Sequence, residues 1–386
     1  MRHVPAGVSG ERRHPGDADR RGYGRELTSP LNILLVRLRL IGDVVFTTPV
    51  IRALRRQFPS ARISYLVEAA AAPVVATNPH LSDVITVTHS RGWQRVVDDL
   101  RLSGRLRRAG FDLVIDLHGG PRSAWLTWAT RAPRRVGYDV PGRQWMYTQV
   151  VHRPRVLRAR HSVENQWDLL PAVDSAFPSN PDPAIDRVEM PADPRATRAI
   201  TNRLRQMGIP DEAHLVVLHV SAGNPFRRWP ESSFAELAAG LAMGGPTRYV
   251  LVTSGPSDHD AATRVIADAR ARAGAAHARI LDIEALSLAE LRATLDRAAL
   301  FVGGDSGPLH IAATSDVPIV GLYGPTLPER SAPWRPRHLK TAAVDAGTLP
   351  CRPCEQRACV PGDFRCLTTI AAARVHAAAE ALIEGA

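Results

Sequence analysis

The chain has 386 residues, 45% of them hydrophobic, which is enough for two globular domains that each bury a core. Lys and Arg number 49 against 38 Asp and Glu, giving a net charge of +11, and Lys340 is the only lysine. The sequence has no apolar run long enough to span a bilayer and no signal-peptide pattern. We therefore expect a cytoplasmic protein rather than a secreted or integral membrane protein.

The excess of arginine favours anionic partners, because a guanidinium group stays charged and binds phosphate through two donors. Part of the charge lies in residues 1–30, where Arg, Gly and Pro dominate without a hydrophobic period. We expect this segment to be a disordered basic tail.

Strand and helix patterns alternate over residues 31–175. The apolar run 31–37 is typical of a strand buried on both faces of a parallel sheet. The patterns that follow predict helices at 44–57, 69–77 and 94–109, and strands at 63–67, 84–87 and 111–117. This alternation predicts a doubly wound α/β domain with its binding crevice at the carboxyl ends of the strands.

A second α/β pattern covers residues 195–368, after a Pro-, Asp- and Ser-rich linker at 176–194. It predicts helices at 196–207, 231–241 and 288–298, and strands at 214–220, 249–253, 318–323 and just before Gly303. The alanine-rich segment 369–386 predicts a C-terminal helix. Two α/β halves joined by a linker form a cleft, which suits an enzyme that joins two substrates.

The stretch from Leu300 to Ala313 reads as a strand, a glycine-rich turn and a helix start. Ser306 is a candidate N-cap, and Pro308 suits the first helical turn. Glycines let a ligand approach the backbone, and free N–H groups at a helix start favour an anion. We interpret the stretch as half of a diphosphate cradle; an ordinary strand-to-helix turn is the alternative.

Asp43 follows the first predicted strand, beside a glycine. A carboxylate there can cap the next helix or act in the crevice. His118, Gly119 and Gly120 follow the strand 111–117 in the same topological position, so we expect them to line the same crevice.

Four segments in this order resemble glycosyltransferase family 9, the bacterial heptosyltransferases. They are Ile33–Pro49 with Arg-Leu-Arg-Leu-Ile-Gly-Asp, Ser221–Pro230 ending Phe-Arg-Arg-Trp-Pro, Gly303–Ala313 with Asp-Ser-Gly-Pro-Leu-His, and the C-terminal cysteine group. The resemblance implies a GT-B fold, in which two Rossmann-like domains face a central cleft and a C-terminal helix commonly packs back on the N-terminal domain.

The same resemblance implies an inverting, metal-independent transfer of a heptose. The donor would be ADP-heptose or another nucleotide-diphosphate sugar, held mainly by the C-terminal half. The acceptor would be the lipopolysaccharide core or another glycolipid, met at the cytoplasmic face of the inner membrane by a peripherally associated enzyme.

By resemblance, Asp43 falls on the proposed general base, which is needed because a sugar hydroxyl must lose its proton as the bond forms. Asp305, Ser306, Gly307 and His310 fall on the family's nucleotide-sugar contacts, although His310 could be only a hydrogen-bonded structural residue. Arg227 stands where many members have a lysine that meets the leaving phosphate. It keeps the charge but changes the reach.

Three further residues are candidate donor contacts. Ser221 and Asn224 lie in the loop that precedes Arg227. Asp258 lies where the family often has a glutamate near the nucleotide, and its alternative role is that of an acid at a helix N-terminus.

All four cysteines fall in one short window: Cys351, Cys354, Cys359 and Cys366. In a chain without an export signal, this clustering favours reduced thiols or a structural metal over stable disulfides. A structural zinc, redox-labile thiols and packed thiols remain open, and no cofactor is required for catalysis.

Two other functions fit parts of the sequence. The same fold could serve a nucleotide-sugar epimerase or a transferase for another sugar. A basic, zinc-containing nucleic-acid-binding protein is the non-enzymatic alternative, but the basic residues are scattered and form no recognition motif, so we expect no nucleic acid.

Overall fold

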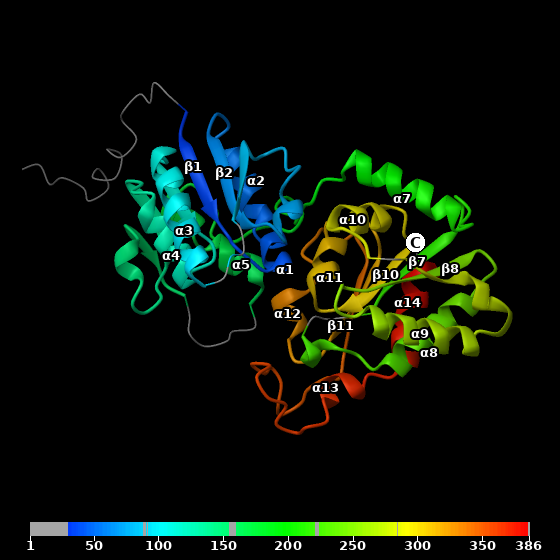
Figure 1. The fold of residues 1–386 in the computed structure, drawn as a ribbon. Helices are drawn as coiled ribbons and strands as arrows, with labels where there is room; N and C mark the ends of the chain where they lie inside the picture. Colours follow the sequence, from blue (N-terminus) through cyan, green and yellow to red (C-terminus); the bar gives the residue numbers. More distant parts are fainter. Residues whose placement is uncertain are drawn as a thin grey trace, which may run out of the picture.

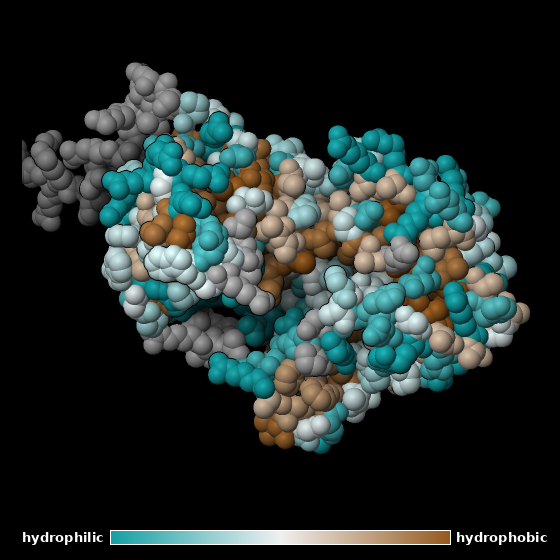
Figure 2. Space-filling model, in the orientation of Figure 1, coloured by the Kyte–Doolittle hydropathy of each residue, from teal (hydrophilic) through white to brown (hydrophobic). Residues whose placement is uncertain are grey.

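The computed structural model describes residues 30–87, 90, 92–153, 160–220, 224–283 and 285–384. The predicted basic tail lies outside the described residues except for its last position. Two six-stranded parallel sheets form the centres of two domains (Figure 1). A hollow lies along the seam between the two halves, and brown, hydrophobic residues gather along part of that seam (Figure 2).

The first sheet has the order β3-β2-β1-β4-β5-β6. Its strands are β1 (Asn32–Val36), β2 (Arg62–Glu68), β3 (Asp83–Val87), β4 (Leu113–Asp116), β5 (Arg134–Tyr138) and β6 (Gln149–Val151). Its helices are α1 (Ile41–Val45), α2 (Thr48–Gln57), α3 (Gly92–Arg108), α4 (Pro121–Ala129), α5 (Ser162–Trp167) and α6 (Leu170–Val173), with short 3-10 turns η2 (Ala72–Val74) and η3 (Gln144–Met146).

The second sheet repeats this winding in the order β12-β11-β10-β7-β8-β9. Its strands are β7 (His214–His219), β8 (Arg248–Thr253), β9 (Ile280–Asp282), β10 (Leu300–Gly304), β11 (Ile319–Tyr323) and β12 (Thr341–Asp345). Its helices are α7 (Pro194–Gln206), α8 (Glu231–Met243), α9 (His259–Arg272), α10 (Leu288–Asp296), α11 (Gly307–Ala312), α12 (Pro328–Ser331), α13 (Arg365–Thr368) and α14 (Ala372–Glu384), with η4 (Pro225–Arg227) and η5 (Gly274–Arg279).

In each sheet the strand order reverses between the first strand and the fourth. A crevice opens outside the carboxyl ends of the strands at such a point, and this is where doubly wound folds bind ligands. The two crevices follow β1 and β4 in one domain and β7 and β10 in the other. The predicted α/β fold with two Rossmann-like domains is confirmed.

Three sequence-based expectations differ from the structure. The helix predicted at 44–57 is two helices, because the hydroxyls of Thr47 and Thr48 bond back to the carbonyls of Val44 and Val45 and Pro49 supplies no N–H. The helix predicted at 69–77 is only the single turn η2, which contains Pro73.

The third difference concerns α14. It contacts α8, β10, β11 and β12 of its own domain instead of packing back on the N-terminal domain. Small buried residues let it lie close, and a Cβ on Gly240 of α8 would meet the His376 ring at 2.9 Å. Among the described residues, no helix is both long and apolar enough to cross a membrane.

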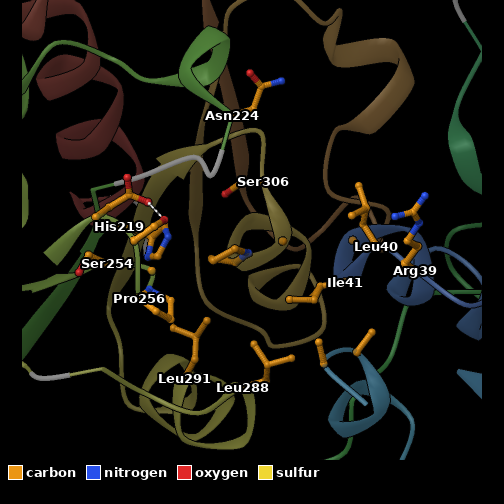
Figure 3. A pocket seen from close by; sticks show the side chains of 18 of the residues that line it. Arg39, Leu40, Ile41, His219, Asn224, Ser254, Pro256, Leu288, Leu291 and Ser306 are labelled. Atoms are coloured by element: carbon orange, nitrogen blue, oxygen red, sulfur yellow. Dashed lines mark hydrogen bonds between the residues drawn. The ribbon is translucent and has the colours of Figure 1, made fainter. Parts of the chain in front are cut away.

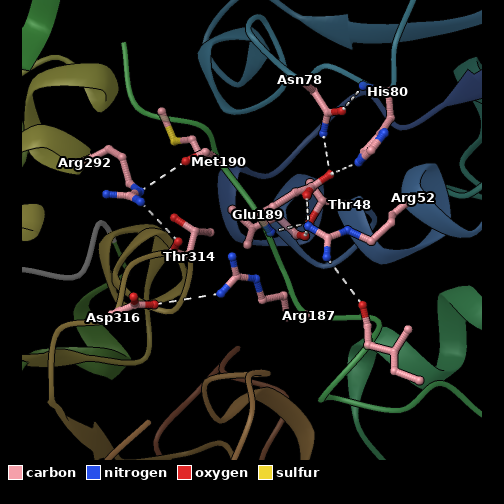
Figure 4. A network of polar contacts seen from close by, with 12 residues as sticks. Thr48, Arg52, Asn78, His80, Arg187, Glu189, Met190, Arg292, Thr314 and Asp316 are labelled. Carbon is pink, nitrogen blue, oxygen red and sulfur yellow. Dashed lines mark hydrogen bonds and ion pairs between the residues drawn. The ribbon is translucent and has the colours of Figure 1, made fainter. Parts of the chain in front are cut away.

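The segment that connects the two domains forms hydrogen bonds with both of them (Figure 4). On the first side, the Glu189 carboxylate accepts from Arg52 and from Asn78 Nδ2, the latter at 2.9 Å. On the second side, the Met190 carbonyl accepts from Arg292 Nε at 3.1 Å. Neighbouring residues therefore hold opposite domains, which fixes the cleft between them.

Candidate active site

Two neighbouring cavities lie in the cleft, with volumes of about 710 and 590 Å³. Both are lined by the loop after β1 and by the stretch after β10. The residues common to both are Leu40, Gly42, Arg227, Asp305, Ser306 and Gly307. The two switch-point crevices thus face each other and form one site.

The helix starts of α1 and α11 meet across the cleft. A Cβ on Gly42 would lie 2.3 Å from Cδ2 of His310, and one on Gly307 would lie 3.2 Å from Ile41 Cβ. Each domain therefore presents a glycine where the other domain presents a side chain. This contact brings Asp43, next to Gly42, into the same cavity as His310.

Asp43 caps its own helix and also lines a cavity, while its role as a base stays a prediction. Its Oδ2 accepts from the backbone N–H of Leu40 at 3.2 Å, and Arg37 Nη2 lies 2.6 Å from the same oxygen. The side chain of Asp43 is 35% exposed and lines the smaller cavity. Arg37 is buried and donates to the Leu117 carbonyl at 2.7 Å. The guanidinium thus fixes the carboxylate and ties the end of β1 to the end of β4.

The charges of Arg37 and Asp43 both act on the imidazole of His118. Burial, followed by the charges of Arg37 and Arg39, lowers its pKa to about 4, although Asp43 acts in the opposite direction. Its loop is shaped by the buried Asp116, whose Oδ1 accepts from the N–H groups of His118 and Gly119 at 2.9 and 3.0 Å. The imidazole is therefore neutral at physiological pH.

Asp305 is 2% exposed and lies among three polar partners. Its Oδ2 accepts from the Thr326 hydroxyl and lies 3.4 Å from Arg227 Nη1, while His310 Nε2 is 3.4 Å from its Oδ1. Burial alone would raise its pKa, but His310, Arg227 and Thr326 outweigh this effect and lower the pKa to about 2. A permanent carboxylate thus orients Arg227 and His310, and the expected contact with sugar hydroxyls stays a prediction.

Arg227 is held through two different nitrogens. Nη1 donates to the Asp305 carbonyl at 2.9 Å, and Nε donates to Gln356 Oε1 at 2.8 Å. The same Oε1 accepts from Asn224 Nδ2 at 2.7 Å. The side chain of Arg227 is 29% exposed and lines both cavities, so its remaining donors can meet an anion.

Ser306 and Asp258 differ from simple capping residues. Ser306 precedes α11, but its Oγ donates to the Gly304 carbonyl at 3.2 Å and caps no helix N–H. Asp258 precedes α9 and makes no side-chain cap; it is buried and pairs with Arg228 Nη2 at 2.8 Å on the wall of the larger cavity. Ser221 lies outside the described residues.

Apolar side chains from both domains and polar side chains of the second domain line the larger cavity (Figure 3). Leu288 and Leu291 of α10 face Leu40 and Ile41 of the first domain across it. Ser254, Asp258 and His219 add polar groups to the same cavity, and His219 Nδ1 lies 3.0 Å from the Thr253 hydroxyl. The cavity thus offers apolar contacts and polar groups side by side.

The family model of glycosyltransferase family 9 (heptosyltransferase) matches residues 100–363. The chain belongs to glycosyltransferase family 9. Among curated proteins of this family, it is 30% identical to lipopolysaccharide heptosyltransferase 1 of Pseudomonas aeruginosa over 85% of this chain and 87% of that protein. It is 26% identical to a lipopolysaccharide heptosyltransferase 3 of Escherichia coli over 90% of this chain and 97% of the other.

Solved structures agree on the fold of this family 9 protein. The family 9 glycosyltransferase of Veillonella parvula superposes with a TM-score of 0.79, at 22% identity, over 93% of this chain and 98% of that one. The ADP-heptose lipopolysaccharide heptosyltransferase II of E. coli gives 0.73, at 21% identity, over 92% and 99%. The predicted GT-B fold is confirmed.

Two residues of the family 9 site were not found from the sequence. Thr326 and Gln356 hold Asp305 and Arg227, but they lie in loops without periodicity. Gln356 lies between Cys354 and Cys359, where the cysteine spacing is the only pattern in the sequence. A polar residue in that window is only a weak indication of a contact in the site.

The cysteine window is a loop beside the site. Cys354 lines the smaller cavity and its N–H donates to the Pro325 carbonyl at 3.1 Å. All four cysteines are free and partly buried, and among the described residues no group of three or more His, Cys, Asp or Glu is arranged to hold a metal ion. Burial, with the other three cysteines, raises the pKa of the Cys366 thiol. A structural zinc remains a prediction.

Proposed function

We propose that this protein transfers a heptose from ADP-heptose to a lipopolysaccharide core or related glycolipid. One observation carries the proposal: Asp43 of the first domain shares a cavity with Arg227 and Asp305 of the second. The names of the curated relatives support the sugar and the acceptor, and solved relatives include E. coli heptosyltransferase WaaC with ADP.

Asp43 acts as the general base in this mechanism. Its carboxylate is partly exposed and is oriented by Arg37, so it can take the proton of an acceptor hydroxyl as the oxygen attacks the anomeric carbon. Attack on the face opposite the diphosphate forms one C–O bond as the other breaks, which inverts the anomeric configuration.

Arg227 stabilises the leaving diphosphate. Its guanidinium is held by Asp305 and Gln356 before substrate arrives, so little reorganisation is needed when negative charge develops. A fixed cation of this kind supports transfer without a metal ion. The nucleoside would lie in the larger cavity, with its base between the apolar residues of α10 and α1.

A glycolipid acceptor would bring the enzyme to a membrane surface. A lipopolysaccharide precursor is a glycolipid, so we propose peripheral association with the cytoplasmic face of the inner membrane. A transferase for another sugar on this fold is the remaining alternative, and donor choice decides between the two.

Titration calorimetry tests the donor site. ADP should bind more tightly than UDP or GDP, Asp305→Asn should weaken ADP binding, and Asp43→Asn should leave it unchanged. In turnover assays with EDTA present, ADP release from ADP-heptose should require acceptor and should fall roughly 10²- to 10⁴-fold in Asp43→Asn. Selective binding of UDP or GDP would reject the assignment of donor, and turnover that persists in Asp43→Asn would reject the base.

A further inference from the structure

The longest helix of the first domain, α3, leaves one apolar face uncovered. Trp93, Val96 and Leu100 are 77%, 45% and 57% exposed. Their spacing of three and four residues puts them on one face of the helix. The opposite face packs on the sheet through the buried Leu102 and Leu106. The first three turns of α3 therefore show a hydrophobic stripe to the outside.

The acids of α3 are bound on its inner side. Asp99 accepts from Arg122 of α4 at 3.1 Å, and only 14% of its side chain is exposed. Asp98 accepts from Ser90 and from Gln94 Nε2, the latter at 3.0 Å, and is 24% exposed. The negative charges of the helix are thus already paired within the protein.

The arginines of α3 point outward by contrast. Arg101 is 74% exposed at its side chain, although its Nη1 lies 3.9 Å from Asp98, and the last turn carries Arg105, Arg107 and Arg108, all exposed. The helix therefore combines an apolar stripe with cations beside and beyond it. This is the pattern of a helix that lies in the interface of an anionic bilayer, where aromatic and aliphatic side chains enter the acyl boundary and arginines meet lipid phosphates.

We propose that the outer face of α3, formed by Trp93, Val96, Leu100 and the flanking arginines, docks this protein on an anionic phospholipid surface. A second copy of the chain fits less well, because a two-fold contact would gather arginines of both copies in one interface without acids to pair them. Lipid phosphates complement those charges.

The position of α3 suits access to the cleft. Its first turn follows the carboxyl end of β3, and Asp43 follows the carboxyl end of the parallel strand β1 in the same sheet. Arg122, which binds Asp99 of α3, also lies 3.6 Å from Glu68, a residue of the larger cavity. Docking through α3 would hold this edge of the cleft at the membrane. That role for the docking surface rests on the proposed glycolipid acceptor.

Vesicle flotation of the full chain tests the surface. Phosphatidylcholine vesicles with and without phosphatidylglycerol are compared for wild type, Trp93→Ser with Leu100→Ser, and Arg101→Gln with Arg105→Gln. We expect binding that needs phosphatidylglycerol and that falls roughly tenfold in the apolar variant. The charge variant should bind less and lose part of its salt dependence.

A matched control is Ile185→Ser with Met243→Ser, which removes two apolar residues of similar exposure, 55% and 56%, from other surfaces. It should float like wild type. Unchanged flotation of both α3 variants would overturn the proposal, as would an oligomer that dissociates in the apolar variant while vesicle binding persists.

Turnover with a detergent-dispersed acceptor separates this inference from the proposed function. The α3 variants should keep wild-type ADP release there, because α3 lines neither cavity. A wild-type protein that floats but shows no acceptor-dependent ADP release would reject the proposed function and leave the docking surface standing.

Discussion

Gly42 of the first domain lies against the imidazole of His310 in the second, so closely that a Cβ on Gly42 would come within 2.3 Å of Cδ2. The ring cannot easily move away, because His310 is 5% exposed and also packs on Phe46 with ring centroids 4.4 Å apart. We therefore expect Gly42→Ala to push α1 from α11 and displace Asp43. Turnover should fall roughly 10²-fold, because a misplaced base costs that much.

Gly104→Ala is the control for this substitution. Gly104 lies in α3, and its nearest neighbour to an added Cβ is the end of Arg108 at 3.8 Å. Because alanine favours a helix over glycine, this variant should be slightly more stable and fully active. Equal turnover of the two alanine variants would show that the Gly42 contact does not position the base.

Arg227→Lys should lower turnover although it preserves the charge. The guanidinium bonds Gln356 through Nε and the Asp305 carbonyl through Nη1, and a single ammonium cannot reproduce both contacts and still meet a diphosphate. We expect the single-turnover rate constant to fall roughly tenfold for lysine and 10²- to 10³-fold for Arg227→Ala. Arg264→Lys, which alters the surface pair with Glu231, should match wild type.

Gln356 is a positioning residue, because it acts through Arg227 and Asn224. Gln356→Ala should remove one acceptor from both side chains and lower kcat roughly fivefold to tenfold, with a smaller change in KM for the donor. Gln356→Glu keeps the acceptor and should retain more activity than Gln356→Ala. Val360→Ala, in the same loop and 92% exposed, should be neutral. Equal kcat for all three variants would contradict the role.

The sequence located the residues that follow strand ends. Asp43, Asp305 and His310 line the cavities, as expected because the carboxyl ends of parallel strands share one edge of a sheet, and their roles stay predictions. The same rule was wrong for His118, Gly119 and Gly120, which line neither cavity. The partners of the cavity residues could not be predicted in the same way. Gln356 is 129 residues from Arg227 along the chain, and a contact between two aperiodic loops leaves no pattern in either.

The same limit applies to packing. The alanine-rich character of α14 predicted its existence but not the surface that it covers, since small residues allow close approach to any neighbour. The uncovered apolar face of α3 could likewise not be predicted from the sequence. Its apolar residues at 93, 96 and 100 resemble a core stripe, and only the structure shows that Leu102 and Leu106 take the core side.

The stability of the fold should depend on pH through His161. Its Nε2 donates to the Ala332 carbonyl at 2.9 Å, and its Nδ1 accepts from the N–H of Val163 at 3.1 Å. Both nitrogens are used by the neutral form, and burial lowers the pKa from 6.5 to about 4. The unfolded chain therefore binds a proton first as pH falls. The contribution is complete above pH 6.5 and is lost between that pH and about 4.

Urea unfolding measures this effect when it is repeated from about pH 7.5 to about pH 4.5 in steps of roughly half a pH unit. The free energy of unfolding should fall with pH, by up to roughly 3 kcal/mol from His161 alone. His161→Asn can cap α5 without titrating, so its slope should be shallower. His338→Asn, at an exposed position, should keep the wild-type slope. If His161→Asn kept it too, another group would carry the pH dependence.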